Sequence, residues 1–192
     1  MLFNYKEPED HYLDSAIRGE REGLEYLVYT YRNMAYSIAI RITENVEDAE
    51  EVVQDGFLKA FGNLDRFRRA SKFSTWLYRI IYTTALSKAS TNKPRSLELD
   101  NDLQYAHYVV EDEGSELLIE ADRRKFLGIA MQKLKPEDQL IITLHYNAEK
   151  SIAEMSEILN MKSSAIKMRL LRSRQLLQTE LQELLKDEWK NL

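Results

Sequence analysis

The sequence predicts an all-α protein of two small helical domains joined by an acidic linker. The chain of 192 residues contains only 6 glycines and 3 prolines, which favours helices over a turn-rich β fold. Apolar residues recur at spacings of three and four in two blocks, as a helix with one buried face requires. The periodicity fades over residues 90–115, where acidic residues accumulate. We therefore expect one domain over residues 1–89 and another over residues 116–192.

The first block predicts three helices that close one core. A helical pattern covers residues 14–40. Asn45, followed by two acidic residues, marks the start of the next helix. Ser74 or Thr75 could cap a third helix. The apolar face of the first pattern consists of Leu24, Leu27, Val28, Tyr31, Ala35 and Ile38.

Four further helical segments are predicted after the linker. Pro136 suits the first turn of one of them, where its missing N–H has no intrahelical partner. The segments are residues 116–133, 137–146, 151–159 and 163–185.

The composition favours a cytoplasmic protein. The chain has no cysteine, which excludes disulfides and thiolate metal sites and agrees with a reducing compartment. Its first residues lack a signal-peptide pattern, and no stretch approaches the roughly 18 apolar residues of a membrane span. We expect no membrane insertion, no metal and no cofactor.

The net charge of −5 is unevenly distributed. Residues 42–58 hold six acids and no base, whereas residues 66–88 hold six bases and no acid. Such separation predicts two surfaces for two different partners.

Residues 151–170 fit a helix-turn-helix. Asn160 stands at the turn, where it tolerates the left-handed conformation, and Ser163 or Ser164 would cap the second helix. Between residues 162 and 174 there are five bases and no acid. The predicted core is Ala153, Ile158, Met161, Ile166 and Leu170, with Leu171 also on the buried face of the second helix. The predicted DNA-facing bases are Lys167, Arg169, Arg172 and Arg174. The alternative is an amphipathic helix with a solvated basic face.

An acidic turn precedes this block by about a hundred residues. Glu51, Gln54 and Asp55 stand at i, i+3 and i+4 and share one helix face. The face could be solvated, bind a metal or dock on a basic protein. The metal site is disfavoured because the three histidines, His11, His107 and His145, are scattered singly.

Residues 67–79 interleave bases, hydroxyls and aromatics. This mixture suits single-stranded DNA, whose backbone attracts cations and whose unstacked bases need a pocket. Phe73 and Trp76 could instead belong to the core. The functional interpretation is kept for Arg68, Arg69, Ser71, Lys72 and Arg79.

Residues 48–61 and 72–80 resemble regions 2.2 to 2.4 of the sigma-70 family, and residues 134–174 resemble its region 4. The short interval between the two matches is typical of the extracytoplasmic-function (ECF) subfamily. The resemblance implies a transcription initiation factor that binds RNA polymerase core, at the β′ clamp helices and the β flap, and promoter DNA as duplex and single strand. It also implies an anti-sigma factor as partner.

The resemblance assigns residues to three roles. Those implied to bind core polymerase are Asp48, Glu51, Gln54, Asp55 and Leu58. Those implied to bind the −10 element are Arg68, Arg69, Ser71, Lys72, Phe73, Ser74, Thr75, Trp76, Arg79 and Thr83. Those implied to bind the −35 element are Ser163, Ser164, Lys167, Met168, Arg169, Arg172 and Arg174.

Two other classes of protein fit the sequence less well. A helix-turn-helix regulator that acts without polymerase would leave the acidic turn and residues 67–79 without a role. An enzyme is disfavoured because the glycines are too dispersed for a phosphate-binding loop and no nucleophile-base pair is apparent.

Overall fold

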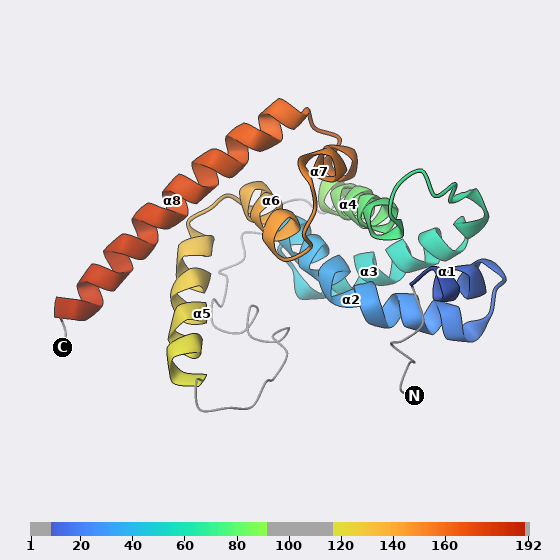
Figure 1. Ribbon diagram of the computed structural model, residues 1–192, viewed down its shortest axis with the longest axis horizontal. Helices are drawn as coiled ribbons and strands as arrows, with labels where there is room; N and C mark the ends of the chain where they lie inside the picture. The colour runs from blue at the N-terminus through green and yellow to red at the C-terminus, as the bar shows by residue number, and fades with distance from the viewer. Residues whose placement is uncertain (1–8, 92–116, 191–192) are drawn as a thin grey trace.

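The computed structural model describes residues 9–91 and 117–190, and within these ranges all regular structure is helical. The all-α prediction is confirmed. The elements, shown in Figure 1, are α1 (Glu9–Ile17), α2 (Arg21–Thr43), α3 (Val46–Phe61), the 3₁₀ helix η1 (Leu64–Arg66), α4 (Phe73–Thr91), α5 (Leu117–Gln132), α6 (Pro136–Tyr146), α7 (Ile152–Leu159) and α8 (Ser163–Lys190). The predicted linker lies outside the described residues apart from its first two positions, which belong to α4.

Helices α1 to α4 form an N-terminal bundle around α2, which packs against each of the other three. The single helical pattern expected over residues 14–40 is wrong in one respect. The chain breaks between α1 and α2 at Gly19, whose φ of +78° suits a residue without a Cβ atom. The buried members of the predicted α2 face are Leu27, Tyr31, Ala35 and Ile38, whereas Leu24 and Val28 are partly buried.

The starts of α3 and α4 differ in how their backbone donors are satisfied. The side chain of Asn45 accepts a hydrogen bond from the Asp48 backbone N–H at 2.8 Å, so the predicted cap of α3 is confirmed. The predicted caps of α4 are wrong, because Ser74 and Thr75 lie inside its first turn. The Thr75 hydroxyl donates instead to Glu154 of α7, and the Ser74 hydroxyl accepts from Lys150 just before α7. Sequence periodicity does not reveal these contacts.

Helices α5 to α8 form the C-terminal part of the molecule. Pro136 occupies the first turn of α6, as predicted. Helix α8 is 28 residues long and extends well beyond its neighbours at its C-terminal end (Figure 1).

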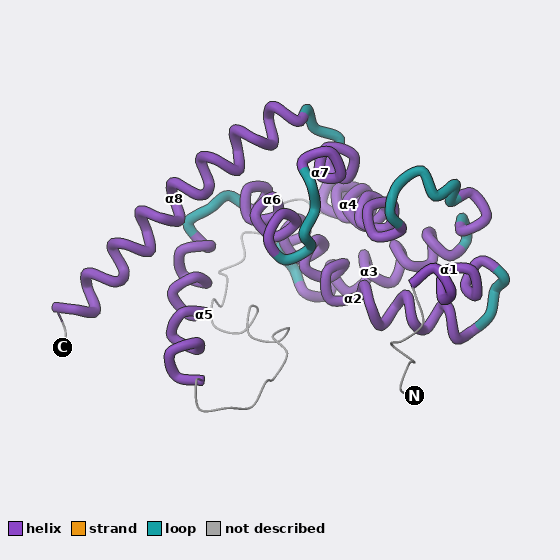
Figure 2. Tube along the Cα trace, viewed as in Figure 1, coloured by secondary structure: helices purple, strands orange, loops and turns teal. Residues whose placement is uncertain are grey.

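The two parts pack directly on each other. Helix α7 lies against α4 and α6 lies against α2, so buried residues of both parts belong to one hydrophobic cluster. Figure 2 shows the loop before α4, drawn in teal, on the same side of the molecule as α7. The contact places the predicted DNA-opening segment beside the helix-turn-helix.

Candidate functional site

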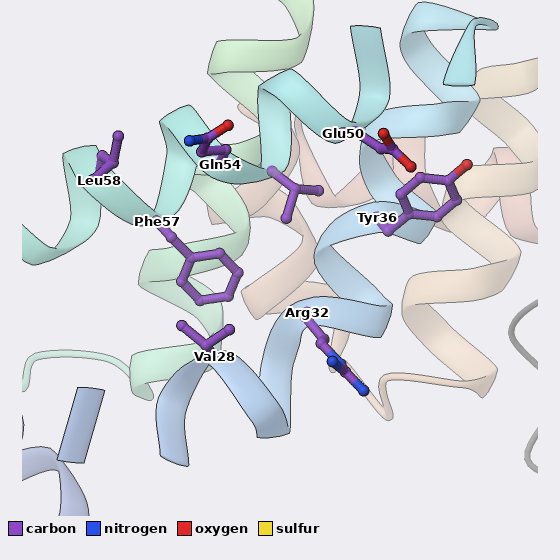
Figure 3. Close-up of a pocket in the computed structure, with 8 residues that line it drawn as sticks. Val28, Arg32, Tyr36, Glu50, Gln54, Phe57 and Leu58 are labelled. Carbon is purple, nitrogen blue, oxygen red and sulfur yellow. The ribbon is translucent and has the colours of Figure 1, made fainter. Parts of the chain in front are cut away.

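An open groove of about 530 Å³ lies between α2 and α3. Its floor includes Phe57, which is 6% exposed, and its rim includes Leu58, which is 63% exposed. Figure 3 shows Phe57 of α3 and Val28 of α2 pointing toward each other across this space. The lining residues are Val28, Arg32 and Tyr36 from α2 and Glu50, Val53, Gln54, Phe57 and Leu58 from α3.

The five residues predicted to bind core polymerase divide between two faces of α3. Gln54 and Leu58 line the groove, and Asp55 is exposed beside them. Asp48 and Glu51 face α4 instead, and Lys88 lies 3.5 Å from Asp48 and 2.6 Å from Glu51. The hydrogen bond to Glu51 and the charges of both acids raise the pKa of Lys88. Part of the acidic charge is therefore already neutralised within the bundle.

The α2 side of the groove was not predicted. Val28, Arg32 and Tyr36 are spaced four residues apart and therefore share one stripe of the helix. That spacing was a usable signal, but it does not reveal that α3 lies opposite.

The connecting loop, residues 67–72, joins η1 to α4. Arg69 adopts a left-handed backbone conformation, with φ of +54°. Its guanidinium group donates a hydrogen bond to Asp14 and lies 3.6 Å from Asp10, so two of the acids of α1 hold it. Arg68 is exposed, and among the described residues no acidic side chain forms an ion pair with it. The two neighbouring arginines thus have different environments.

Aromatic rings pack the start of the connecting loop against α4. The ring of Phe67 lies 5.2 Å from Trp76 and 5.6 Å from Phe73, measured between centroids. Phe73 is 3% exposed, so it belongs to the core, whereas Trp76 is partly buried. The aromatic cluster fixes the loop against α4.

A second groove, of about 470 Å³, adjoins Trp76. Thr83 lies in it and is exposed, with its hydroxyl bonded back to the carbonyls of Arg79 and Ile80. Arg79 is exposed as well. The lining residues are Lys59, Asn63, Arg66, Trp76, Ile80, Thr83, Thr84 and Ser87. Three of them are cations or amides, which suits an anionic or nucleobase ligand.

Four of the predicted −10 residues contact the C-terminal part of the chain. The hydroxyl of Ser71 donates to Glu157 at 3.3 Å, and that of Thr75 donates to Glu154 at 3.2 Å. The ammonium group of Lys72 lies 3.7 Å from Glu154. The fourth contact joins Ser74 to Lys150, whose ammonium donates at 2.5 Å.

The charges at this contact are unusual because Lys150 is only 6% exposed. Burial lowers its pKa, while the Glu154 carboxylate 3.7 Å away acts in the opposite direction. Burial alone would raise the pKa of Glu154, but hydrogen bonds from the Ser151 backbone and hydroxyl and the charge of Lys150 lower it to about 2. Glu154 therefore stays ionised at neutral pH.

Helices α7 and α8 form the predicted helix-turn-helix. Ser151 caps α7 in a capping box with Glu154, and Asn160 takes the left-handed conformation expected at the turn, with φ of 52°. The predicted core is partly wrong, since Ala153 and Leu171 are exposed and Met155 is buried instead. The residues Ile158, Ile166 and Leu170 are buried as predicted, and Met161 is partly buried.

The basic face of α8 is largely accessible. Ser163 and Ser164 lie exposed in its first turn, and neither precedes the helix as the predicted cap would. Arg169 is bound to α6, with its guanidinium 2.8 Å from Glu137 and 3.1 Å from Asp138. The other exposed members of the predicted set are Lys167, Met168, Arg172 and Arg174, and Arg174 also lies over the ring of Tyr146.

Among the described residues, no group of three or more His, Asp or Glu side chains is arranged to hold a metal ion. None of the described helices is both long and apolar enough to cross a membrane.

Two family profiles match the chain, one in each of its two helical parts. Sigma-70 region 2 matches residues 27–94, which include both grooves, and Sigma-70, region 4 matches residues 129–177, which include the helix-turn-helix. The chain belongs to the sigma-70 family. It is an ECF-type sigma factor, which acts in transcription initiation together with RNA polymerase core and promoter DNA.

Curated relatives cover almost the whole length of this sigma factor. It is 29% identical over 175 residues to the ECF RNA polymerase sigma factor SigW of Bacillus subtilis, covering 87% of this chain and 93% of SigW. It is 27% identical over 176 residues to the ECF RNA polymerase sigma-E factor of Escherichia coli K12, covering 88% of this chain and 92% of that factor. It is 25% identical over 192 residues to the RNA polymerase sigma-H factor of Pseudomonas aeruginosa, covering 95% and 98%.

Solved structures show the same fold. CnrH in complex with the cytosolic domain of CnrY aligns with a TM-score of 0.61 at 20% identity, covering 91% of this chain and 97% of CnrH. The sigma factor RpoE in complex with the anti-sigma factor NepR from Bartonella quintana aligns with a TM-score of 0.59 at 20% identity, covering 82% and 96%.

Proposed function

We propose that the α2–α3 groove binds the β′ clamp helices of core polymerase. The observation that supports this role is the combination of an apolar floor at Phe57, an exposed apolar rim at Leu58 and the polar side chain of Gln54. An interface centre commonly combines a desolvated apolar anchor with surrounding polar contacts. The outer contacts on the same helix would be Asp48, Glu51 and Asp55.

The connecting loop and the second groove are proposed to hold the −10 strand. Arg68 and Lys72 are exposed cations on the loop, and Thr83 lies in the groove that begins at Trp76. Cations that follow the backbone and a pocket for an unstacked base are the two requirements of strand capture. Arg69 has a supporting role, because α1 already binds it.

Helix α8 is proposed to read the −35 duplex. Lys167, Met168 and Arg172 are exposed at its N-terminal half, which is the part of a recognition helix that enters the major groove. The β flap would contact another face of the same domain.

We also propose where the protein acts, how its two domains behave and which regulator binds it. The protein acts in the cytoplasm, catalyses no reaction and uses no cofactor. Residues 1–89 and 116–192 act as separate domains once bound to polymerase, joined by residues 90–115. One aligned sigma factor, RpoE, was solved in complex with the anti-sigma factor NepR, which supports an anti-sigma partner for this chain.

The proposed function is tested by transcription in a purified system. Core polymerase with this sigma factor should give promoter-specific run-off transcripts from genomic fragments, and core polymerase alone should not. If the chain binds those promoters as duplex without polymerase and gives no transcript, a polymerase-independent regulator would be the better assignment.

The −35 assignment predicts the effect of truncating two exposed bases. Lys167→Ala and Arg172→Ala should each weaken holoenzyme binding to promoter DNA by about 1–3 kcal/mol, because each removes a base-edge or phosphate contact. Electrophoretic mobility shifts over a range of salt measure the effect. Lys125→Ala, which removes an exposed cation from α5, is the matched control. Equal binding by all three variants would place the recognition surface elsewhere.

The −10 assignment predicts a defect in strand opening. Arg68→Ala with Lys72→Ala should leave polymerase binding intact but reduce the amount of open complex. Flipping a base out of the duplex costs a few kcal/mol, and contacts between these cations and the DNA backbone offset that cost. Permanganate footprinting of unpaired thymines on linear promoter DNA measures opening. A pre-melted template should rescue the variant, and normal opening on linear DNA would show that the connecting loop is only structural.

A further inference from the structure

Helix α7 presents an acidic edge to the connecting loop. Glu154 and Glu157 are three residues apart and therefore lie on one side of the helix. Both carboxylates accept hydrogen bonds from the N-terminal bundle, at 3.2 Å from Thr75 and at 3.3 Å from Ser71. Lys72 adds an ammonium group 3.7 Å from Glu154. Two negative groups are thus held by two hydroxyls and a cation.

The donors in this contact are the groups that a DNA strand would need. Hydroxyl and ammonium groups bind the oxygens of phosphates as they bind those of carboxylates, with charge-assisted hydrogen bonds. A carboxylate bound to Thr75 therefore occupies a donor that a phosphate could use. The same side chain cannot serve both partners at once.

Buried contacts around the acidic edge make it a formed interface. Lys150 precedes α7 and donates to Ser74, and its ammonium group lies 5.4 Å from the centre of the Tyr78 ring. Lys150 is 6% exposed and Thr75 is fully buried, so water is largely excluded at this point. Hydrogen bonds in such surroundings are stronger than at an open surface.

We propose that α7 is an internal competitor for the −10 strand. In the unbound chain, Glu154 and Glu157 hold the connecting loop and the start of α4 in a closed arrangement, and single-stranded DNA binds only after α7 has moved away. The inference rests on the proposed function of that segment in holding the strand. Polymerase binding would favour the open arrangement by engaging the two domains separately.

A pair of charge-neutralising substitutions tests the competition. Glu154→Gln with Glu157→Gln removes both charges, and Gln at position 154 still completes the capping box of α7. Glu180→Gln with Glu183→Gln removes the same charge from α8, away from the interface. Circular dichroism establishes that both double variants are folded.

The first measurement is binding of a fluorescein-labelled thymidine 15-mer by anisotropy, without polymerase. The variant at Glu154 and Glu157 should bind about tenfold more tightly than the natural chain, and the α8 control should change less than twofold. Adding Lys72→Ala should remove the gain. An equal gain in the control would mean that net charge alone is responsible, and would overturn the inference.

The second measurement follows closure itself. The chain has no cysteine, so Glu22→Cys and Gln175→Cys provide two unique label sites on exposed positions of α2 and α8. The population with a long label separation should increase in the Glu154 and Glu157 variant and not in the control. Unchanged separations would overturn the inference. Increased separations without tighter DNA binding would instead contradict the proposed strand-binding role of the connecting loop.

Discussion

Leu58→Glu should weaken binding to core RNA polymerase by about a hundredfold or more, because apolar anchors at interface centres account for most of the binding energy. Leu58 is 63% exposed at the rim of the α2–α3 groove, directly after the buried Phe57. Its substitution therefore introduces a charge into the desolvated contact without opening a cavity in the bundle. Competition against a second sigma factor for labelled core polymerase measures the affinity.

Leu127→Glu is the matched control for this substitution. Leu127 is 48% exposed and lies on α5, away from the groove, so the same chemical change there should leave core affinity within about twofold. Thermal unfolding should be similar for both variants. If Leu58→Glu competes as well as the control does, the groove is not the polymerase contact.

The sequence alone was sufficient where a local rule decided the structure. The start of α3 followed from Asn45, whose side chain can satisfy a backbone donor two or three residues ahead. The turn before α8 followed from Asn160, because asparagine adopts the left-handed conformation more readily than most residues. Both features depend on a few consecutive residues, so no knowledge of the tertiary fold was needed.

Prediction failed where a side chain had two possible partners. Ser74 and Thr75 could each cap α4 from the sequence, but both hydroxyls contact the α7 region, about 80 residues further along the chain. Met155 is buried in the core where Ala153 was predicted, and this error has a related cause. Both residues fit a short amphipathic pattern, and packing against α4 and α8 selects the face.

Long-range placement also determined which residues line the α2–α3 groove. Glu51 and Gln54 are one turn apart on α3, yet the first faces Lys88 and the second faces α2. The spacing predicted that they share a surface, but α4 and α2 lie on different sides of α3 and divide it. Identifying the acidic turn was possible from sequence, whereas assigning each member required the bundle.

The contact between α1 and α2 has an equally specific requirement at Gly23. A Cβ atom there would lie 2.3 Å from the backbone N of Ala16 and 2.5 Å from the carbonyl oxygen of Tyr12. Neither backbone atom can rotate away. The two helices approach this closely while the rings of Tyr12 and Tyr26 stack at 3.9 Å between centroids. Sequence periodicity placed no constraint on this glycine, because the constraint comes from a different helix.

Gly23→Ala should therefore destabilise the protein by about 1–3 kcal/mol, since α1 must shift to admit the methyl group. The midpoint of thermal unfolding should fall by roughly 2–12 °C for a chain of this size. Gly128→Ala is the contrasting substitution, because nothing lies within 4 Å of a Cβ atom there and alanine favours the helix interior by about 1 kcal/mol. The Gly23 variant should also release Arg69 from Asp14, because that acid belongs to the displaced helix. Equal midpoints for the two variants would show that α1 is not held where the close backbone approach places it.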